Sequence, residues 1–379
     1  MRTIPLAKPE LGEAEIALVT ETIRSGWITQ GPRVAEFESA FARTVGARHA
    51  IAVSSCTTAL HLALKILGVG QGDEVILASH SFIASANAVR YCGAKPVFVD
   101  IDPQTLNMAP GKIPEAITSH TRAIMVIHQV GRPSDLEAIG SIAKRRGLPL
   151  LEDAACAIGS EYRGQPVGSN RYSSLVCFSF HPRKIISTGD GGMITTDNDE
   201  WNMRLRRLRQ HGMSVNDLQR HQAATVVTEE YLELGYNYRL TDVQAALGLA
   251  QLQRLAGIIQ RRRALAARYD LELARLEKLE LFREPEEARW NQQTYLVRLR
   301  DATASTRDRL MQKLLDAGIA TRRGIMSIHR EPCYVNQYGA RHFPESERAS
   351  DQCLCLPLYP QMTAEDQNYV LEQLQRVTA

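Results

Sequence analysis

Ser179-Phe-His-Pro-Arg-Lys184-Ile-Ile-Ser-Thr-Gly-Asp-Gly-Gly192-Met193 joins a short apolar run, Leu175–Phe178, to a lone lysine and a cluster of glycines. The apolar run predicts a buried strand that ends at a hydroxyl. A lysine beside sharply bending backbone suits Schiff-base chemistry, because the amine must be both desolvated and fixed to meet one carbonyl. Most lysines next to glycine loops are solvated, so this hypothesis needs other residues that converge on the same place.

The composition describes an ordinary globular protein. The chain has 379 residues, of which 44% are hydrophobic and 23% charged, enough for a large core and a second, smaller domain. The net charge of +3 is too small and too evenly spread to indicate nucleic acid or a membrane surface as a partner. The pair Arg322-Arg323 follows a strand-like segment, where contact with an anion is one interpretation.

The cysteines and the N-terminal segment indicate where in the cell the protein is expected. Seven cysteines are present without paired CxxC spacing, so we predict no metal site. Cys353 and Cys355 fall in a strand-like run and are interpreted as a reduced structural pair. The segment from Met1 to Pro5 lacks the apolar region of a signal peptide, and no run of about 18 apolar residues could span a bilayer. We therefore expect a soluble, cytoplasmic protein with no membrane partner.

Strand-like and helix-like segments alternate from residue 50 onward. Most strand-like runs are continuously apolar, which is typical of strands covered on both faces. A helix is expected from Ser134, with Glu137 completing a capping box, to Gly147. This pattern predicts an α/β sandwich with a mostly parallel, seven-stranded sheet between helices. The runs are Ile51–Val53, Glu74–Leu77, Pro96–Val99, Ala123–Ile127, Leu148–Leu151, Leu175–Phe178 and Met193–Thr195.

The pattern changes near residue 241. A long helical run from Thr241 to about Leu276 precedes a strand candidate at Thr294–Leu299 and helices at Thr306–Ala317 and Thr363–Val377. We predict a large α/β domain at residues 1–245, which includes an N-terminal segment with two helices. A smaller α+β domain at residues 246–379 is predicted to include the long connecting helix.

Polar residues follow five of the predicted strands. In open α/β sheets, ligands bind outside the carboxyl ends of the strands, so these residues are expected to face one crevice. Thr57 and Thr58 open a helix, and with Ser179 they could bind a phosphate. Asp153 follows an apolar strand, and a buried carboxylate there needs a cationic or hydrogen-bonding partner, such as a protonated pyridine nitrogen. Phe82 could stack on a flat ring.

With the amine of Lys184, this set describes pyridoxal 5'-phosphate (PLP). Each residue also has a structural interpretation. Asp153 or Thr57 could cap a helix, Phe82 could belong to the core, and His80 and His128 are expected to be hydrogen-bonded structural residues. Taken jointly at one sheet edge, the residues favour a cofactor site.

The same residues resemble those of the DegT/DnrJ/EryC1/StrS family of sugar aminotransferases, within the fold-type I, aspartate aminotransferase-like PLP enzymes. The resemblance runs nearly end to end and includes several long motifs in the right order. They are Ser25-Gly-Trp-Ile-Thr-Gln-Gly-Pro32, Ser54-Ser-Cys-Thr-Thr-Ala-Leu-His61, Gly93-Ala-Lys-Pro-Val-Phe-Val-Asp-Ile-Asp102, Glu152-Asp-Ala-Ala155, Ser179–Met193, Gly235-Tyr-Asn-Tyr-Arg-Leu-Thr-Asp242 and Leu356-Pro-Leu-Tyr-Pro360.

The resemblance implies a role for each site residue. Lys184 would be the catalytic lysine that carries PLP, and Asp153 would contact the pyridine nitrogen. Asn237 would reach the phosphate from the neighbouring subunit, which implies a homodimer. The remaining cofactor-binding residues would be Thr57, Thr58 and Ser179 at the phosphate and Phe82 at the ring face.

Three positions distinguish members of this family. Some members carry histidine at the lysine position and catalyse dehydration, which Lys184 argues against. Where this chain has Cys156, near the ring hydroxyl, relatives often have Gln or His. The usual Gly-Glu-Gly-Gly is Gly189-Asp-Gly-Gly192 in this chain.

The implied reaction is a ping-pong transamination. L-Glutamate would donate the amino group, and a nucleotide-linked keto sugar, for example a 4-keto-6-deoxyhexose, would accept it. The alternatives are a keto-cyclitol as acceptor or a PLP-binding regulatory protein without transaminase activity. A nucleotide-binding protein without PLP that uses the Ser54–Thr58 turn is disfavoured, because the turn lacks a GxGxxG fingerprint.

Overall fold

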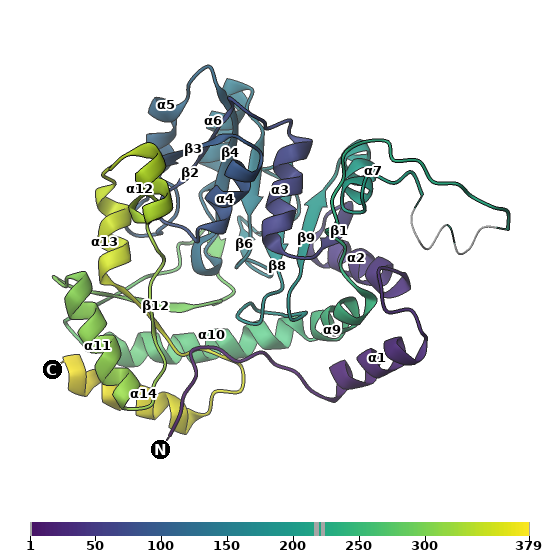
Figure 1. Ribbon diagram of the computed structural model, residues 1–379. Coiled ribbons are helices and arrows are strands. Elements are labelled where there is room, and N and C mark those ends of the chain that lie inside the picture. The colour runs from purple at the N-terminus through teal and green to yellow at the C-terminus, as the bar shows by residue number, and fades with distance from the viewer. Residues whose placement is uncertain (1, 216–219, 221–223, 379) are drawn as a thin grey trace.

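The computed structural model describes residues 2–215, 220 and 224–378 (Figure 1). In this part of the chain, seven strands form the central sheet in the order β1-β9-β8-β5-β4-β2-β3. All neighbours are parallel except that β9 runs antiparallel to both β1 and β8. The predicted mostly parallel, seven-stranded sheet is therefore confirmed. The strands are β1 (His49–Val53), β2 (Glu74–Ala78), β3 (Lys95–Val99), β4 (Thr121–Ile127), β5 (Leu150–Asp153), β8 (Leu175–Ser179) and β9 (Gly192–Thr196).

Alternation along the strands divides the side chains between two cores. Successive side chains of a strand point to opposite faces of a sheet. In β1, Ile51 and Val53 pack in one apolar cluster, while Ala50 and Ala52 pack in another. Helix α3 (Cys56–Ile66) belongs to the first cluster, whereas α2 (Pro32–Val45) and α9 (Asp242–Gln253) belong to the second. The sheet is thus covered by helices on both faces.

Helices α1 and α2 are the two helices predicted in the N-terminal segment. The predicted start of helix α6 at Ser134 is wrong. Its N-cap is Asp135, whose carboxylate accepts from the Ala138 N–H at 3.0 Å. The Ser134 hydroxyl donates instead to the Ile127 carbonyl, so the predicted capping box is absent. The other helices are α1 (Glu13–Arg24), α4 (Ala84–Tyr91), α5 (Ile113–Ala116), α6 (Leu136–Arg146) and α7 (Asp199–Leu208), with 3-10 turns η1 (Pro110–Lys112) and η2 (Gln129–Gly131).

The predicted long helix is two helices. Helix α9 ends before Arg254, which has φ −102° and ψ 2°, and α10 (Leu255–Leu273) begins directly after it and runs across the lower part of the molecule (Figure 1). The first half of α10 packs in the core of the large sheet, and its second half packs in a third apolar cluster with residues from 279 to 374. Helix α10 therefore connects the two parts of the chain.

A smaller antiparallel sheet follows, in the order β10-β12-β14-β13. The N-terminal segment joins this region, because Ile4 bridges to Ile319 and lies in the third cluster. The boundary near residue 245 stays a prediction. The elements are β10 (Leu279–Leu281), β12 (Tyr295–Leu299), β13 (Arg322–Arg323), β14 (Cys353–Leu356), α11 (Ala304–Asp316), η3 (Ile328–Arg330), α12 (Pro332–Tyr338), α13 (Pro344–Gln352) and α14 (Ala364–Thr378), with a separate small sheet of β6 (Glu161–Tyr162), β7 (Gln165–Pro166) and β11 (Ala288–Arg289).

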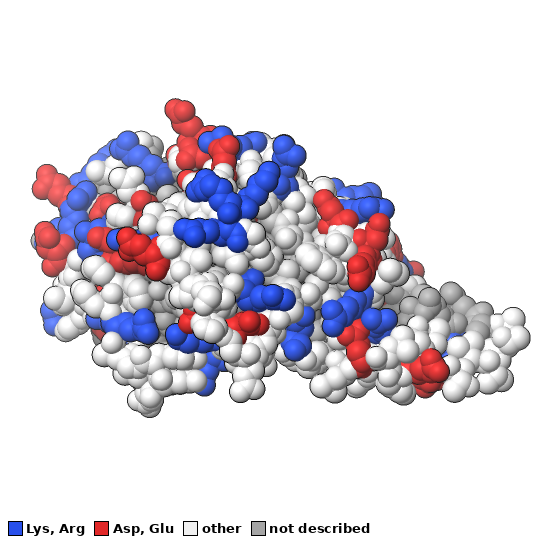
Figure 2. All heavy atoms as spheres, turned by 90° about the horizontal axis from the view of Figure 1, so that it is seen from above, with Lys and Arg blue, Asp and Glu red and all other residues white. Residues whose placement is uncertain are grey.

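The surface fits the expectation from net charge. Seen from above, groups of Lys and Arg and groups of Asp and Glu are scattered over the face, with wide uncharged areas between them (Figure 2). Within the described residues, no helix is long and apolar enough to cross a membrane.

Candidate active site

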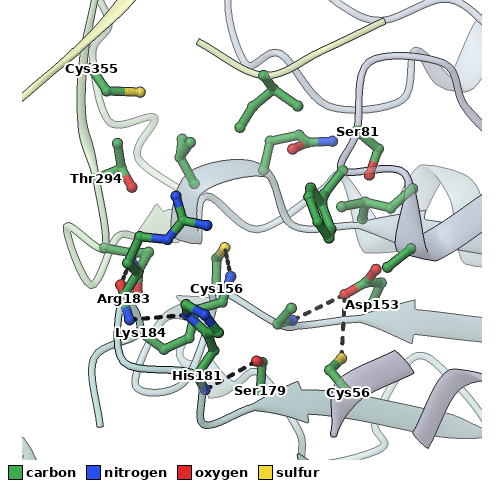
Figure 3. Close-up of a pocket in the computed structure, with 18 of the residues that line it drawn as sticks. Cys56, Ser81, Asp153, Cys156, Ser179, His181, Arg183, Lys184, Thr294 and Cys355 are labelled. Atoms are coloured by element: carbon green, nitrogen blue, oxygen red, sulfur yellow. Dashed lines mark hydrogen bonds between the residues drawn. The ribbon is translucent and has the colours of Figure 1, made fainter. Parts of the chain in front are cut away.

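A cavity of about 300 Å³ opens at the carboxyl ends of the parallel strands, where the small sheet approaches the large one (Figure 3). Five of the seven predicted cofactor-binding and catalytic residues line it: Thr57, Phe82, Asp153, Ser179 and Lys184. Thr58 and Asn237 do not. The part of the chain after α10 contributes Gln293, Thr294, Arg322 and Cys355 to the opposite wall. The site therefore combines residues that lie before and after α10 in the sequence.

Lys184 lies in the loop after β8 with its amine inside the cavity. Its Nζ donates to the sulfur of Cys156 over 3.1 Å (Figure 3). Burial lowers the pKa of Lys184, but attraction to Cys156, then to Cys56 and Asp153, outweighs burial, so the pKa lies above its ordinary value of 10.5. The free amine is held protonated in this arrangement, and Cys156 is the neighbour that holds it.

Asp153 is the last residue of β5 and is 5% exposed. Its carboxylate accepts from the Ser85 hydroxyl at 2.7 Å and from the Ala155 N–H at 3.1 Å. The Cys56 thiol lies 3.9 Å away, and burial followed by the charge of Asp153 raises the pKa of that thiol well above its ordinary value. No Lys, Arg or His of the described residues forms an ion pair with Asp153. A buried carboxylate facing a cavity in this way suits a cationic ligand group.

The start of α3 forms the second side of the cavity. Ser55 is the N-cap, and its hydroxyl accepts from the Thr58 N–H at 3.1 Å. The Thr58 hydroxyl donates to the Ser55 carbonyl at 2.8 Å, so it closes the helix end rather than facing the cavity. Thr57 and Ser179 line the cavity beside this N-terminus, where backbone N–H groups favour an anion.

A close backbone approach fixes this helix end. A Cβ atom on Gly192, the first residue of β9, would lie 2.5 Å from the Ser55 carbonyl carbon and 2.7 Å from the Cys56 nitrogen. Since only glycine avoids this clash, the last glycine of the cluster that follows Lys184 positions the N-terminus of α3. The cluster therefore acts through backbone shape.

Phe82 and the histidines have distinct surroundings. Phe82 is 54% exposed and lines the cavity, so it does not belong to the core. His128 is buried and pairs with Glu152 at 2.8 Å, which agrees with a structural role. The expectation for His80 is wrong, because its buried ring finds no hydrogen-bond partner within the described residues. Burial lowers the pKa of His80 to about 3, so the ring is neutral.

Asn237 lies outside the cavity and is exposed. Its neighbours Tyr236 and Tyr238 stack on each other with ring centroids 4.9 Å apart. The Tyr238 hydroxyl contacts Nδ1 of His61 on α3 at 3.1 Å. The two tyrosines thereby anchor the segment to the chain's own large domain and leave Asn237 accessible.

Sequence reasoning missed three residues of the site. Ser85 and Cys56 contact Asp153 from the first turns of α4 and α3, and their serine and thiol groups are too common to be found by pattern. Arg183 lines the cavity and immediately precedes the lysine. An arginine next to a candidate catalytic lysine is a signal that could have found it.

Comparison with known proteins gives one consistent result. The model of the DegT/DnrJ/EryC1/StrS aminotransferase family matches residues 9–375. Among solved structures, the chain is similar to the aminotransferase TlmJ from Streptoalloteichus hindustanus, with 36% identity, a TM-score of 0.91 and coverage of 99% of this chain and 98% of that chain.

Two further structures resemble the chain over nearly their full lengths. Spr1654 from Streptococcus pneumoniae in its PLP-form has 28% identity and a TM-score of 0.93, covering 100% of this chain and 99% of that chain. The sugar aminotransferase CalS13 from Micromonospora echinospora has 29% identity and a TM-score of 0.88, covering 99% of this chain and 100% of that chain. The chain belongs to the DegT/DnrJ/EryC1/StrS aminotransferase family, and it is an enzyme of that class.

Proposed function

We propose that this aminotransferase moves an amino group from L-glutamate to a nucleotide-linked keto sugar, such as a 4-keto-6-deoxyhexose, in two half-reactions at one site. PLP is its cofactor. The observation that carries the proposal is the joint placement of Lys184, Asp153 and the N-terminus of α3 around one cavity. The likeness to sugar aminotransferases such as CalS13 supports a sugar as the acceptor.

The residues of the cavity fit PLP. Asp153 is buried and lacks a cationic partner among the described residues, so its carboxylate is suited to a protonated ring nitrogen. The phosphate would lie at the start of α3, near Thr57 and Ser179, with Thr58 stabilising the helix end. Phe82 is exposed beside the cavity, where it could cover the ring face. Lys184 is placed to hold the cofactor covalently.

Bound PLP supplies an electron sink, which stabilises negative charge on the carbon that bears the transferred nitrogen. Asp153 maintains that property by keeping a positive charge on the ring nitrogen. Lys184, once free, carries the proton between the two carbon atoms of the exchange as general base and then general acid. Ser85 and the Ala155 N–H hold the Asp153 carboxylate in place for both half-reactions.

A homodimer and a cytoplasmic location are parts of the same proposal. Asn237 is exposed on a segment anchored by Tyr236 and Tyr238, as required for a side chain that completes a neighbouring subunit's phosphate site. Large apolar side chains are also exposed outside the cavity, among them Ile28 and Tyr91, and a second copy of the chain could cover them. All seven cysteines are free, as expected for a reducing compartment.

The decisive experiment is a spectral titration of the PLP-bound enzyme with L-glutamate, followed by a panel of nucleotide-linked keto sugars. We expect glutamate to convert the enzyme to its pyridoxamine phosphate form, and one of the sugars to restore the PLP form with formation of an amino sugar. Failure of glutamate and other amino donors would favour a PLP-binding regulatory protein. Turnover with keto-cyclitols in place of sugars would select the other acceptor class.

A further inference from the structure

Two guanidinium groups enter the cavity from opposite domains. Arg183 lies in the loop that carries Lys184, and Arg322 lies on β13 of the small sheet; both line the cavity. Neither forms an ion pair with a carboxylate of the described residues. By contrast, the adjacent Arg323 pairs with Glu331 at 3.5 Å. We call Arg183 and Arg322 the cationic pair.

The backbone of the pair is held firmly. The Arg183 N–H donates to Nδ1 of His181 at 3.2 Å, and the Arg183 carbonyl accepts from the Gln293 side chain at 2.6 Å. Arg322 is paired with Cys355 in the β13–β14 ladder. In Figure 3, the Arg183 side chain extends from its loop towards Thr294 of the small domain. The protein therefore fixes the main chains of two like-charged residues that line the same cavity.

Two positive charges that share a cavity are unfavourable unless an anion lies near them. Burial and then the charge of Arg183 lower the pKa of Arg322, so the two cations repel each other. Asp153 and Asp190 also line the cavity, but neither carboxylate forms an ion pair with these arginines in the described part of the chain. Like charges that share a cavity are stabilised by a bound anion, and the planar guanidinium fork matches a carboxylate with two parallel hydrogen bonds.

We propose that Arg183 and Arg322 bind the carboxylate of the amino donor. This inference rests on the proposed function, because it assigns a substrate group to the same cavity. In every amino-acid donor, the carbon next to the transferred nitrogen carries a carboxylate. That nitrogen must come close to Lys184, so a cation on the neighbouring residue lies within reach of the carboxylate. The phosphates of a nucleotide-linked sugar lie several bonds further from its keto carbon.

The test separates the two half-reactions. We expect Arg322→Gln and Arg183→Gln each to raise the half-saturating concentration of L-glutamate by about 10–100-fold, the effect of losing a hydrogen bond between charged groups. The rate at saturation should change much less. Binding of glutarate, which has no amine and cannot react, should weaken by a similar factor in calorimetry. L-Alanine carries only the α-carboxylate, so an equal loss is expected with L-alanine as donor, and no loss would contradict the proposal.

Two further variants control for charge and folding. Arg330→Gln removes the same charge from the same segment, but Arg330 lies outside the cavity and pairs with Asp351, so donor binding should stay unchanged. Arg322→Lys keeps the charge without the fork and should restore part of the affinity. The proposal is overturned if the Gln variants change glutamate and glutarate binding by less than about 3-fold.

It is also overturned if the pyridoxamine phosphate forms of these variants lose affinity only for the sugar, because the pair would then bind the acceptor's phosphate. The donor half-reaction is measured without any sugar. A failed search for the acceptor therefore leaves this result intact.

Discussion

At the scale of single residues, Lys184 carries the clearest expectation. In Lys184→Ala, the cavity keeps Asp153 and the start of α3, so we expect PLP to bind without a covalent bond. Turnover should fall at least about 1,000-fold, since loss of an acid–base group alone costs about 10²–10⁴-fold. Borohydride reduction followed by mass spectrometry should find PLP fixed to Lys184 in the native enzyme and no fixed PLP in the variant.

Lys144→Ala is the matched control. Lys144 is exposed on α6 and lies outside the cavity, so this variant should keep both the covalent attachment and the activity. Full activity in Lys184→Ala would show that another residue carries the proton.

The sequence predicted the role of a site residue where a charged side chain had few structural explanations. A lysine in a glycine-rich loop and an aspartate at a strand end indicated the site because charged groups in such places need partners. Ser85 and Cys56 could not be assigned, because their contacts with Asp153 depend on which segments the fold brings together. The 3.1 Å contact between Lys184 and Cys156 also joins residues from different loops and follows from the three-dimensional structure alone.

At the scale of elements, Gly192 tests how β9 supports the cofactor site. An alanine Cβ would overlap the backbone at Ser55, so Gly192→Ala must displace either β9 or the N-terminus of α3. We expect a loss of about 1–3 kcal/mol in the free energy of unfolding, as for overpacking in a core, together with weaker PLP binding. Urea unfolding and a fluorescence titration with PLP measure the two effects.

Gly257→Ala provides the opposite case. No atom lies within 4 Å of its Cβ position, and Gly257 is inside α10, so this change should stabilise the protein by up to about 1 kcal/mol. Equal behaviour of the two variants would refute a special role of Gly192.

Glu38 of α2 gives a prediction on pH. It is buried, pairs with Arg206 at 2.6 Å and with Arg209, and accepts from the Ala52 N–H at 2.9 Å. Burial raises the pKa of Glu38, but the two arginines outweigh burial, and the pKa lies below its ordinary value of 4.5. A carboxylate with a lowered pKa stabilises the fold above its unfolded pKa, and this contribution is lost as the pH falls through the lowered value.

We therefore expect Glu38→Gln to cost about 3 kcal/mol at pH 7, because it leaves buried arginine charge uncompensated. The difference from the native protein should narrow as the pH falls below 4.5, and urea unfolding at several pH values measures it. Glu36→Gln on the exposed side of the same helix should have little effect. A gap that stays constant with pH would contradict the assignment to Glu38.

Elements were easier to predict than their ends. Continuously apolar runs identified all seven strands of the large sheet, because burial on both faces leaves little choice of residue. The capping box at Ser134 was wrong because Asp135 competes for the same helix end, and the break at Arg254 has no proline or glycine directly beside it. Such details depend on local competition and on tertiary packing.

At the scale of the whole molecule, the sequence indicated a cavity shared by two domains only indirectly. Arg322 and Lys184 are 138 positions apart in the numbering, and nothing in either segment specifies the other. The periodic apolar pattern predicts layers, whereas the approach of the small sheet to the large one depends on the packing of α10 against both. Assembly with a second chain depends on contacts between two molecules, so it has to be tested by experiment.

Complementation between two inactive variants tests that assembly. Asn237→Asp places a negative charge where the proposal expects contact with a partner's phosphate, so this variant should bind PLP poorly and turn over slowly. Lys184→Ala is inactive for a different reason. In a mixed dimer, the Asn237→Asp subunit supplies Lys184 and the Lys184→Ala subunit supplies Asn237, so one site is complete and the other carries both defects.

Random pairing makes half of the dimers mixed, and half of the sites in those dimers are complete. We therefore expect the mixture to regain roughly a quarter of the native glutamate half-reaction per site, although neither variant is active alone. Subunits with different tags, co-expressed and separated, allow the mixed dimer itself to be measured at about half of the native value. If Asn237 acted in the site of its own chain, each of the two sites in a mixed dimer would carry one defect and both would be inactive. A verified mixed dimer without activity would therefore mean that Asn237 does not act across the interface.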